Sequence, residues 1–305
     1  MNISRLVVFM IVGTMLLIQC GCSSTKKLAV NMVGDALAGG GETWSSDNDP
    51  ELIREALPFS LKLVESLLAE SPEHDGLLFT AASGFTQYAY AFVQMDAERI
   101  ADQDFEKALE MKARARKLYI RGRDYGFRGL EARHKGFREA FLDDPDTAIL
   151  KTDAKDLPML YWTAVSWVSA ISIDKTDMEA IGDLPYVTVL VDRALELDPD
   201  WNQGALYSLM ITFAMNRQDL EGEPEAVARE FFEKAKEATG GQDASIYVSL
   251  AESVCIPRQD KAEFKELMNK ALAVDVDVRK ESRLLNTLMQ KRAEWLLSRT
   301  DELFF

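Results

Sequence analysis

Histidine, the side chain best suited to acid–base chemistry near neutral pH, is scarce in this sequence, which has two, His74 and His134. Neither histidine belongs to an HExxH motif or to another spacing that holds a metal ion. The sequence also lacks GxSxG, GxxxxGK[ST] and GxGxxG patterns. No predicted strand precedes Gly122, Gly126 and Gly129, which disfavours a phosphate-binding loop. We therefore expect no catalytic residue, no metal site and no cofactor.

An acid-rich stretch and a cysteine remain as candidate sites. Residues 143–156 are rich in Asp but lack the alternating ligands, the central Gly and the terminal Glu of a calcium-binding EF-hand loop. We expect a solvated loop there. Cys20 and Cys22 lie at the end of the predicted signal region described below, which leaves Cys255, between Val254 and Ile256, as the one cysteine of the mature chain. This excludes a disulfide framework, and the sequence has no CxxC metal motif. A small buried apolar side chain is the favoured interpretation, and a reactive thiol is the alternative.

The charges are distributed unevenly along the chain. Between Lys112 and Arg138, ten lysines or arginines stand against two acids, a net charge of +8, whereas the whole chain carries −15. The overall negative charge argues against binding to nucleic acid. The basic segment is interpreted first as a solvated helix face that pairs locally with acids. Alternatively it docks an acidic partner or an anionic ligand, with Arg121, Arg123 and Arg128 as candidate contacts.

Aromatic residues gather in two segments, around residues 85–92 and 161–167. At helical spacing, such residues more often form a core than a ligand pocket. Tyr88, Tyr161 and Trp162 nevertheless combine an apolar ring with a polar atom, as the walls of small-molecule pockets do. We retain these three as candidate contacts to a ligand or partner.

The N-terminus has the pattern of a bacterial signal peptide. A short segment with one positive charge, Met1–Arg5, precedes an apolar run from Leu6 to Ile18. This run is too short for a good membrane span but has the length of a signal-peptide core. The alternatives are a secretory signal without lipidation and an uncleaved anchor.

The run ends in a sequence that resembles the lipobox of bacterial lipoproteins. Gly21 supplies the small residue required before the acylated cysteine, so Cys22 is the favoured site, although Gln19 replaces the usual Leu or Val. Cys20 is the alternative. The prediction is a signal peptide over residues 1–21 and a lipidated tether with a short helix over residues 22–49. Ser23 in place of Asp predicts anchoring to the periplasmic face of the outer membrane.

From Pro50 onward, apolar residues recur at spacings of three and four, which predicts amphipathic helices. One helix is expected to end at Ser71 and the next to run from about His74 to Met95. Further helices are expected from near Leu157 and from Trp201. Residues 50–305 are therefore predicted to form one all-α domain.

The ends of the later helices recur at intervals of about 41 and 36 residues, close to the length of a tetratricopeptide repeat. No unit carries the complete pattern of that repeat. Helix pairs of this kind bury their apolar faces by stacking, so we expect tetratricopeptide-like repeats in a curved helical array. An irregular helical bundle is the alternative.

Two segments carry a resemblance to a known family. The run of residues 115–125, ARKLYIRGRDY, and the run of residues 160–164, LYWTA, together with the lipobox and the degenerate repeats, resemble the TatT family. These lipoproteins are associated with tripartite ATP-independent periplasmic (TRAP) transporters. The resemblance covers nearly the whole mature chain and implies a homotrimer with hydrophobic pores or clefts, paired with a periplasmic substrate-binding protein.

The resemblance thus implies an accessory lipoprotein of a TRAP transporter that binds the substrate-binding protein and a small hydrophobic or carboxylated ligand. The alternative is a general scaffold lipoprotein that supports the assembly of envelope complexes. An enzyme is disfavoured because it would require a cluster of titratable residues in a cleft. The family offers no catalytic motif to compare.

Overall fold

The computed structural model describes residues 30–217 and 219–305, and every regular element within these ranges is a helix. The predicted all-α fold with packed helical repeats is therefore confirmed for this part of the chain. The predicted signal peptide, Cys20 and Cys22 lie outside it. Within the described residues, no helix combines the length and the apolar composition that crossing a bilayer requires.

A helix over residues 30–39 comes first. The elements of the N-terminal half then follow as α2 (Gly41–Ser45), α3 (Pro50–Glu70), α4 (Asp75–Ala89), η1 (Tyr90–Gln94), α5 (Met95–Ile100), α6 (Phe105–Arg133), α7 (Phe137–Asp143), α8 (Pro145–Ile149) and α9 (Leu157–Ser172). The C-terminal half contains α10 (Met178–Ile181), α11 (Leu184–Leu197), α12 (Trp201–Phe213), η2 (Ala214–Asn216), α13 (Pro224–Thr239), α14 (Ala244–Leu250), η3 (Ala251–Cys255), α15 (Ile256–Arg258), α16 (Lys261–Leu272), η4 (Lys280–Ser282), α17 (Arg283–Ser298) and α18 (Thr300–Leu303).

Aspartate side chains begin several of these helices. Asp49 accepts hydrogen bonds of 3.1 Å from the backbone N–H groups of Glu51 and Leu52 at the start of α3. Asp104 accepts a bond of 3.0 Å from the N–H of Lys107 at the start of α6. The first N–H groups of a helix have no partner within the helix, so these carboxylates stabilise the N-terminal ends of α3 and α6.

Most of the predicted helix boundaries agree with the structure. The first long helix ends directly before Ser71, and α9 begins at Leu157, both as predicted. The helix expected from His74 to Met95 is longer, because α4 continues through η1 into α5 and ends at Ile100.

The element η1 is a π-helical turn inside this continuous helix, and η3 is a second one between α14 and α15. A π-turn widens the helix by one residue and redirects the side chains that follow it. Such turns are frequent at functional positions. Side chains of both π-turns contact α17, as described below for the candidate functional site.

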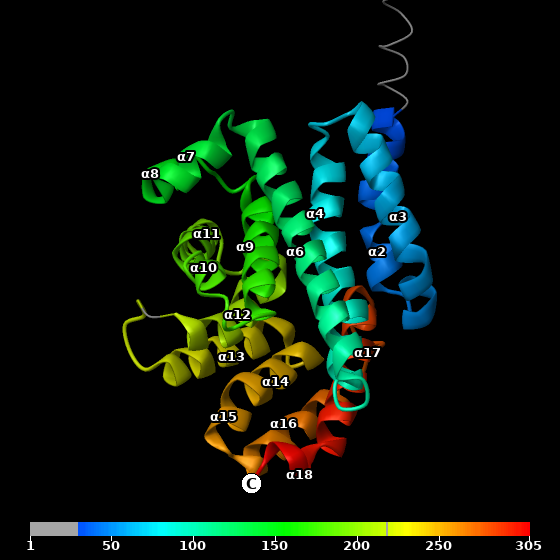
Figure 1. Ribbon diagram of the computed structural model, residues 1–305, viewed down its shortest axis with the longest axis vertical. Helices are drawn as coiled ribbons and strands as arrows, with labels where there is room; N and C mark the ends of the chain where they lie inside the picture. Colours follow the sequence, from blue (N-terminus) through cyan, green and yellow to red (C-terminus); the bar gives the residue numbers. More distant parts are fainter. Residues whose placement is uncertain (1–29, 218) are drawn as a thin grey trace, which may run out of the picture.

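The helices pack mostly in antiparallel neighbours, which produces a curved array (Figure 1). In the N-terminal half, α3 packs on α4, α4 on α6, α6 on α9 and α9 on α11. In the C-terminal half, α12 packs on α13, α14 on α16 and α16 on α17. Each helix thus buries its apolar face against its neighbours, as in repeat proteins.

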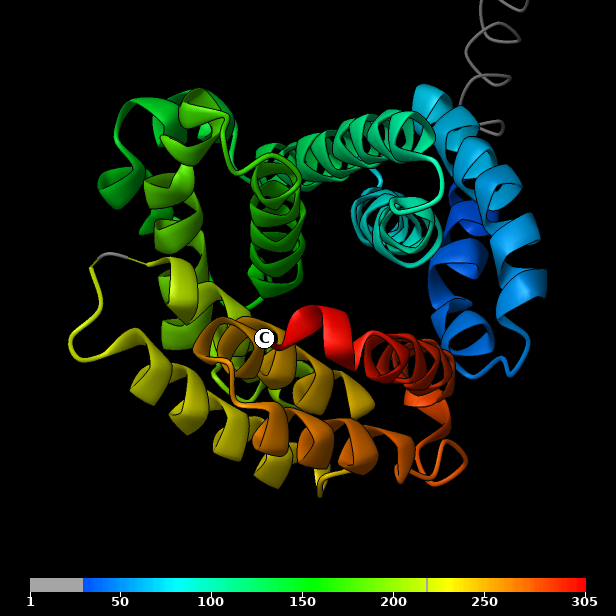
Figure 2. The same cartoon turned by 60° about the horizontal axis from the view of Figure 1, so that its bottom comes forward.

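The array closes on itself, because α17 packs against α2 and α3 at the beginning of the chain (Figure 2). The Arg283 Nη1 atom donates to the Ser46 carbonyl oxygen at 3.1 Å. At the other end of α17, Arg299 Nη2 lies 2.8 Å from Asp102 Oδ2. The first and last parts of the described chain are therefore direct neighbours.

A stripe of glycines lets α6 approach its neighbours closely. A Cβ atom at Gly122 would lie 2.5 Å from the Thr86 Oγ1 atom of α4, and one at Gly126 would lie 2.1 Å from the Thr163 Oγ1 atom of α9. Gly129 is similarly close to Met159 of α9. These glycines thus serve helix packing, which explains a run that has no preceding strand.

The segment before α3 packs against the domain. The Ser71 Oγ atom donates to Asn31 Oδ1 at 2.8 Å, and the Trp44 ring packs against the core. The sequence predicted a tether with a short helix over residues 22–49. The described part of this range contains the helix over residues 30–39, and it contacts the domain through Asn31 and Trp44. The domain boundaries stay a prediction.

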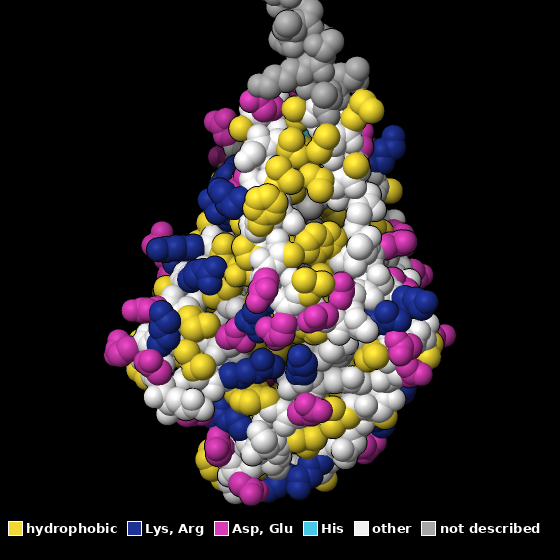
Figure 3. Space-filling view, turned by 90° about the vertical axis from the view of Figure 1, so that its right-hand side faces the viewer, with side chains coloured by type: hydrophobic (Ala, Val, Ile, Leu, Met, Phe, Trp, Pro, Cys, Tyr) yellow, Lys and Arg dark blue, Asp and Glu magenta, His cyan; other side chains and the backbone are white. Residues whose placement is uncertain are grey.

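One face of the N-terminal helices keeps apolar side chains in solvent. Leu52, Phe59 and Leu63 of α3 are exposed, as are Met32 and Val33 of the preceding helix. Figure 3, which shows the side of the molecule where α3 lies, has hydrophobic side chains running along this face. We call these five residues the α3 stripe.

Candidate functional site

The structure distributes the six residues predicted to contact a ligand or partner over three places. They lie in the layer of α3, α4 and α6 (Tyr88, Arg121, Arg128), between α6 and α9 (Arg123), and between α9 and α12 (Tyr161, Trp162). They therefore do not form one site. Their contacts to a ligand remain a prediction.

The arginines of the first group are already engaged. Arg121 Nε lies 3.2 Å from Glu65 Oε1, and its guanidinium group stacks 5.1 Å from the centre of the Phe85 ring. Arg128 donates to the Pro72 carbonyl oxygen at 3.1 Å and stacks over Tyr125. These contacts fasten α6 to α3 and α4.

Glu65 is the centre of this fastening. Its carboxylate accepts from Lys62 Nζ at 2.5 Å and from the Tyr125 hydroxyl at 2.9 Å. Burial raises the pKa of Glu65, but the hydrogen bonds from Lys62 and Tyr125 and the charge of Arg121 outweigh it and lower the pKa below its usual value. The Glu65 carboxylate is therefore ionised and pairs with Arg121. An anionic ligand would have to compete with Glu65 for this arginine.

Tyr88 and Arg123 have partners as well. The Tyr88 hydroxyl accepts from Arg114 Nη2 at 3.3 Å, and the residue is buried. Arg123 donates to Asp124 at 3.0 Å and stacks over the Trp167 ring. Arg121 and Arg123 thus pair with acids, as the favoured interpretation of the basic segment expects.

The third group has an unused polar atom. The Tyr161 ring stands edge-on to Trp162 at 5.1 Å and also lies 5.1 Å from the ring of Trp201. Burial raises the pKa of Tyr161 well above its usual value, and the nearby Asp243 raises it further. Its hydroxyl group makes no hydrogen bond to the described residues.

The backbone beside this aromatic group is strained. Directly after Trp201, three successive residues, Asn202, Gln203 and Gly204, have φ angles of 49°, 60° and 81°. Two of them have side chains, for which left-handed geometry costs roughly 1–2 kcal/mol each. Strain of this kind is often kept at functional sites. The turn fixes the direction in which the Trp201 ring meets Tyr161.

The structure also shows a buried polar cluster that the sequence reasoning missed. Arg292 of α17 is 7% exposed and donates to both oxygens of Glu252 in η3, at 2.6 and 2.8 Å. Its Nη1 atom lies 2.8 Å from Glu98 Oε2 in α5. We call these three residues the Arg292 cluster. The Arg292 cluster joins the two helices that contain the π-turns to α17.

Neutral polar side chains extend the Arg292 cluster. Gln94 of η1 donates to Glu98 at 2.9 Å and accepts from the Tyr119 hydroxyl at 2.7 Å. Among the described residues, the Tyr90 hydroxyl has only the Met289 sulfur, 4.0 Å away, as a partner. Burial raises the pKa of Tyr90 to about 12, so this hydroxyl group remains a donor at physiological pH.

The charges of the Arg292 cluster determine what it can bind. One guanidinium group stands between two carboxylates, so the cluster does not attract a carboxylate ligand. Burial lowers the pKa of Arg292, but Tyr90 and the two glutamates outweigh it and raise the pKa above its usual value. The arginine is therefore permanently charged, and the arrangement suits holding helices together. Charged residues within apolar runs, such as Glu252 between Ala251 and Val254, were the signal available in the sequence.

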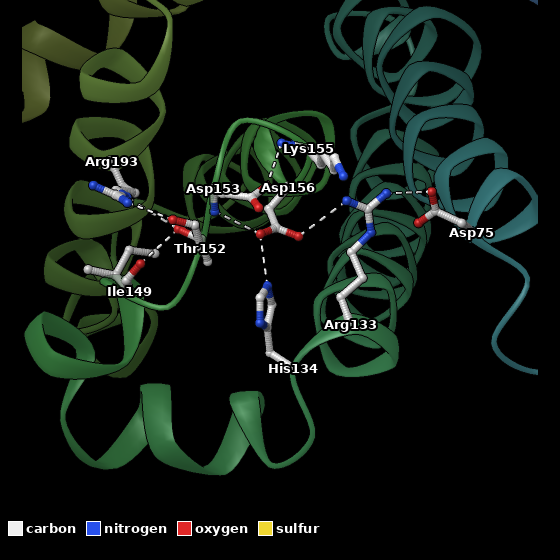
Figure 4. A network of polar contacts seen from close by, with 9 residues as sticks. All are labelled: Asp75, Arg133, His134, Ile149, Thr152, Asp153, Lys155, Asp156 and Arg193. Carbon is white, nitrogen blue, oxygen red and sulfur yellow. Dashed lines mark hydrogen bonds and ion pairs between the residues drawn. The ribbon is translucent and has the colours of Figure 1, made fainter.

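A second polar network lies at the C-terminal end of α6 (Figure 4). Asp156 is 1% exposed and accepts from His134 Nε2 at 2.8 Å and from the Asp153 N–H at 2.9 Å. Arg133 lies between Asp156, at 3.5 Å, and Asp75 of α4, at 2.6 Å. Each polar group has a partner, which anchors the segment before α9.

The same segment corrects one expectation. Residues 143–156 were expected to form a solvated loop, but they include the helix α8, and Ile149, Thr152 and Asp156 are buried. Arg193 of α11 donates to the Thr152 carbonyl oxygen at 2.6 Å. The expectation was wrong for these residues because apolar side chains and distant arginines hold the segment in place.

Cys255 has the environment of a structural residue. Its side chain is fully buried, and its Sγ atom lies 3.4 Å from Glu263 Oε2. Burial and the nearby carboxylate raise the pKa of this thiol to about 12. Such a thiol is protonated and a poor nucleophile, which favours the interpretation as a buried apolar residue.

Within the residues that the structure describes, no group of three or more His, Cys, Asp or Glu side chains is arranged to hold a metal ion. His134 and Asp156 contact each other, but two side chains are too few for such a site. The positive charge of Arg133 also balances the negative charge of Asp156. The arrangement is that of a packed helical protein with two buried polar networks and an aromatic group with a free hydroxyl.

Comparison with known proteins matches nearly the whole described chain. The family model described as TRAP transporter T-component matches residues 46–304. A protein of Treponema pallidum (strain Nichols), described as uncharacterized, is 29% identical over 306 aligned positions, which cover 94% of each protein. The match begins just before α3 and ends in the residue after α18, so it includes both polar networks.

Proposed function

Because this chain belongs to the TRAP transporter T-component family, we propose that it is the membrane-anchored periplasmic accessory protein of such a transporter and binds the periplasmic substrate-binding protein. The family match over residues 46–304 carries the proposal. The closed helical array supports it, since stacked helical repeats present large surfaces for protein partners.

A small ligand forms the second part of the proposal. Tyr161 and Trp162 are the contacts that we favour for it, because their aromatic group includes a hydroxyl that makes no hydrogen bond within residues 30–217 and 219–305. Arg121, Arg123 and Arg128 are paired with other residues. A hydrophobic ligand with one hydrogen-bond acceptor therefore fits better than a carboxylated one.

The anchor and the oligomeric state complete the proposal. Acylation of Cys22, with Cys20 as the alternative, would attach the chain to the periplasmic face of the outer membrane. Several acyl chains hold a domain stably, where one chain binds only marginally. The family resemblance further implies a homotrimer.

The first test is sedimentation velocity of the mature chain with Cys22→Ala, alone and mixed with the TRAP substrate-binding protein of the same organism. A faster-sedimenting species that contains both proteins would support the proposal. If the two proteins sediment independently at all accessible concentrations, the role as a partner of the binding protein is wrong, and a general scaffold becomes the better interpretation.

The anchor is tested separately by cell fractionation. Cys22→Ala should move the protein from the membrane to the soluble periplasmic fraction, whereas Cys20→Ala should leave it in the membrane. The reverse result would assign acylation to Cys20.

A further inference from the structure

The α3 stripe is a second apolar face on a helix whose first apolar face is already buried. Ile53, Val64 and Leu68 point inward and are buried, with α4 as the packing partner of α3. Leu52, Phe59 and Leu63 lie seven and four residues apart, which places them together on the opposite side of the helix. Phe59 is 73% exposed. Packing among the residues that the structure describes therefore leaves this seam uncovered.

The segment that carries the α3 stripe is acidic. Residues 30–70 contain eight acids against two bases, a net charge of −6. Glu55 lies beside the seam, is exposed, and has no partner among the described residues. Apolar surface with an acidic rim suits a partner that combines apolar and basic side chains, and it does not suit an anionic membrane surface.

The N-terminal half of α6 has this complementary composition. Phe105 is 63% exposed and Leu109 is also exposed, and Lys112 follows on the same side of the helix at a spacing of four and three. Residues 105–117 contain five bases against two acids, a net charge of +3. Lys112 and Lys117 have no partner among the described residues.

We infer that the α3 stripe of one copy docks on the N-terminal half of α6 of a second copy, apolar residues against apolar residues and Glu55 toward the lysines. This contact joins two different surfaces. Each copy therefore offers its α3 stripe to one neighbour and the N-terminal half of its α6 to the other neighbour. It gives the self-association included in the proposed function a specific interface, and it rests on that part of the proposal.

Charge selects this arrangement over a two-fold contact of stripe with stripe. A two-fold contact would place two segments of net charge −6 against each other, which is unfavourable. Contacts between unlike surfaces build closed rings when the rotation between copies is suitable. Chains anchored through their N-termini in one membrane also share one orientation, which matches a ring around the membrane normal.

The test is sedimentation velocity of the mature chain with Cys22→Ala, without any other protein. The parent chain is expected to sediment as an oligomer, and Phe59→Glu and Phe105→Glu are each expected to prevent growth beyond the monomer. Both side chains are exposed, so neither variant removes core packing, and circular dichroism checks that both fold. Leu150→Glu, at an exposed leucine after α8, is the control and should leave the oligomer intact.

A mixture of the two variants gives the sharpest result. Phe59→Glu keeps an intact α6 surface and Phe105→Glu keeps an intact stripe, so together they should form a one-to-one dimer that neither forms alone. Raised salt should weaken this dimer. A mixture that stays monomeric, a Phe105→Glu variant that dimerises alone, or a monomeric parent chain would each overturn the proposal.

These outcomes are independent of the binding protein. If the parent chain self-associates as described but ignores the substrate-binding protein, the proposed function fails and the interface stands. If it binds that protein as a monomer, the interface fails and the function stands.

Discussion

Gly126 of α6 lies so close to Thr163 of α9 that a Cβ atom added to the glycine would stand 2.1 Å from the threonine Oγ1 atom. The threonine cannot turn away at no cost, because its hydroxyl group donates to the Met159 carbonyl oxygen at 2.6 Å. The distance between α6 and α9 is thus set by the absence of one methyl group.

Gly126→Ala is therefore expected to destabilise the protein, although alanine normally favours helix. Overpacking of a tight core costs about 1–3 kcal/mol, and the melting temperature should fall by roughly 2–10 °C. Gly39→Ala is the matched control, because no atom lies within 4 Å of its added Cβ. The control should stabilise slightly, by about 0.4–1 kcal/mol. Equal melting temperatures for both variants would contradict the packing role.

Arg292→Met is expected to destabilise the fold more strongly. It leaves the half-buried Glu98 and Glu252 without their shared cation. Breaking a fully buried ion pair in this way costs about 3–5 kcal/mol, and partial exposure of the two carboxylates places the expected loss at the lower end of this range, about 3 kcal/mol. The triple variant Arg292→Met, Glu98→Gln, Glu252→Gln removes the uncompensated charges and should recover most of the loss. Urea unfolding measures both.

The control for this series is Arg258→Met. Arg258 is exposed and lies 2.7 Å from Glu225, and a surface pair of this kind contributes about 0–1 kcal/mol. A triple variant that is no more stable than Arg292→Met would show that shape, and not charge, determines the role of Arg292.

The fold was predictable from the sequence because its determinants are local. The spacing of Leu61, Val64 and Leu68 gives the buried face of α3, and its end at Ser71 follows from the proline after it. The π-turn that carries α4 past Met95 was not predictable. It depends on tertiary contacts with α6 and gives no periodic signal.

The candidate site was less predictable because its partners are distant in sequence. The arginines of α6 were recognised as a charge cluster, but their pairing with Glu65 of α3 and Asp177 of α10 depends on the tertiary arrangement. The Arg292 cluster joins residues from three helices, and no spacing in the sequence connects them. Composition identifies such residues only as charged positions within apolar runs.

Cys255 is expected to react with thiol reagents only when the protein unfolds. Its pKa of about 12 leaves a very small thiolate fraction at pH 8. Reaction should be roughly a thousandfold slower than for an exposed thiol, even before burial limits access. Ellman's reagent measures this on the mature chain with Cys22→Ala, with and without urea. Rapid labelling of the folded protein would indicate a reactive thiol.

Acid is expected to destabilise the fold through carboxylates whose pKa values are lowered. Hydrogen bonds from Arg229 lower the pKa of Glu263, and the contacts of Glu65 with Lys62, Tyr125 and Arg121 lower its pKa against the effect of burial. A carboxylate of this kind stabilises the fold above its unfolded-state pKa of about 4.3. That contribution is lost as the pH falls through the lower folded-state pKa.

Glu263→Gln tests this dependence. The variant should be less stable at pH 7 and should lose less stability than the parent chain between pH 5 and pH 3, as thermal unfolding at each pH would show. Glu294→Gln, at an exposed glutamate without a partner among the described residues, is the control. Parallel pH curves for parent and Glu263→Gln would contradict the assignment.

The contact of α17 with α2 and α3 removes the freedom that open repeat proteins have to change length. An open solenoid can gain or lose a unit at either end, since each unit needs only its neighbours. Here α17 must reach α2 and α3, so duplication of one helix pair would push these helices apart and expose the surfaces that they bury. The closed array therefore accommodates changes of side chains and loops more readily than a change in its number of helices.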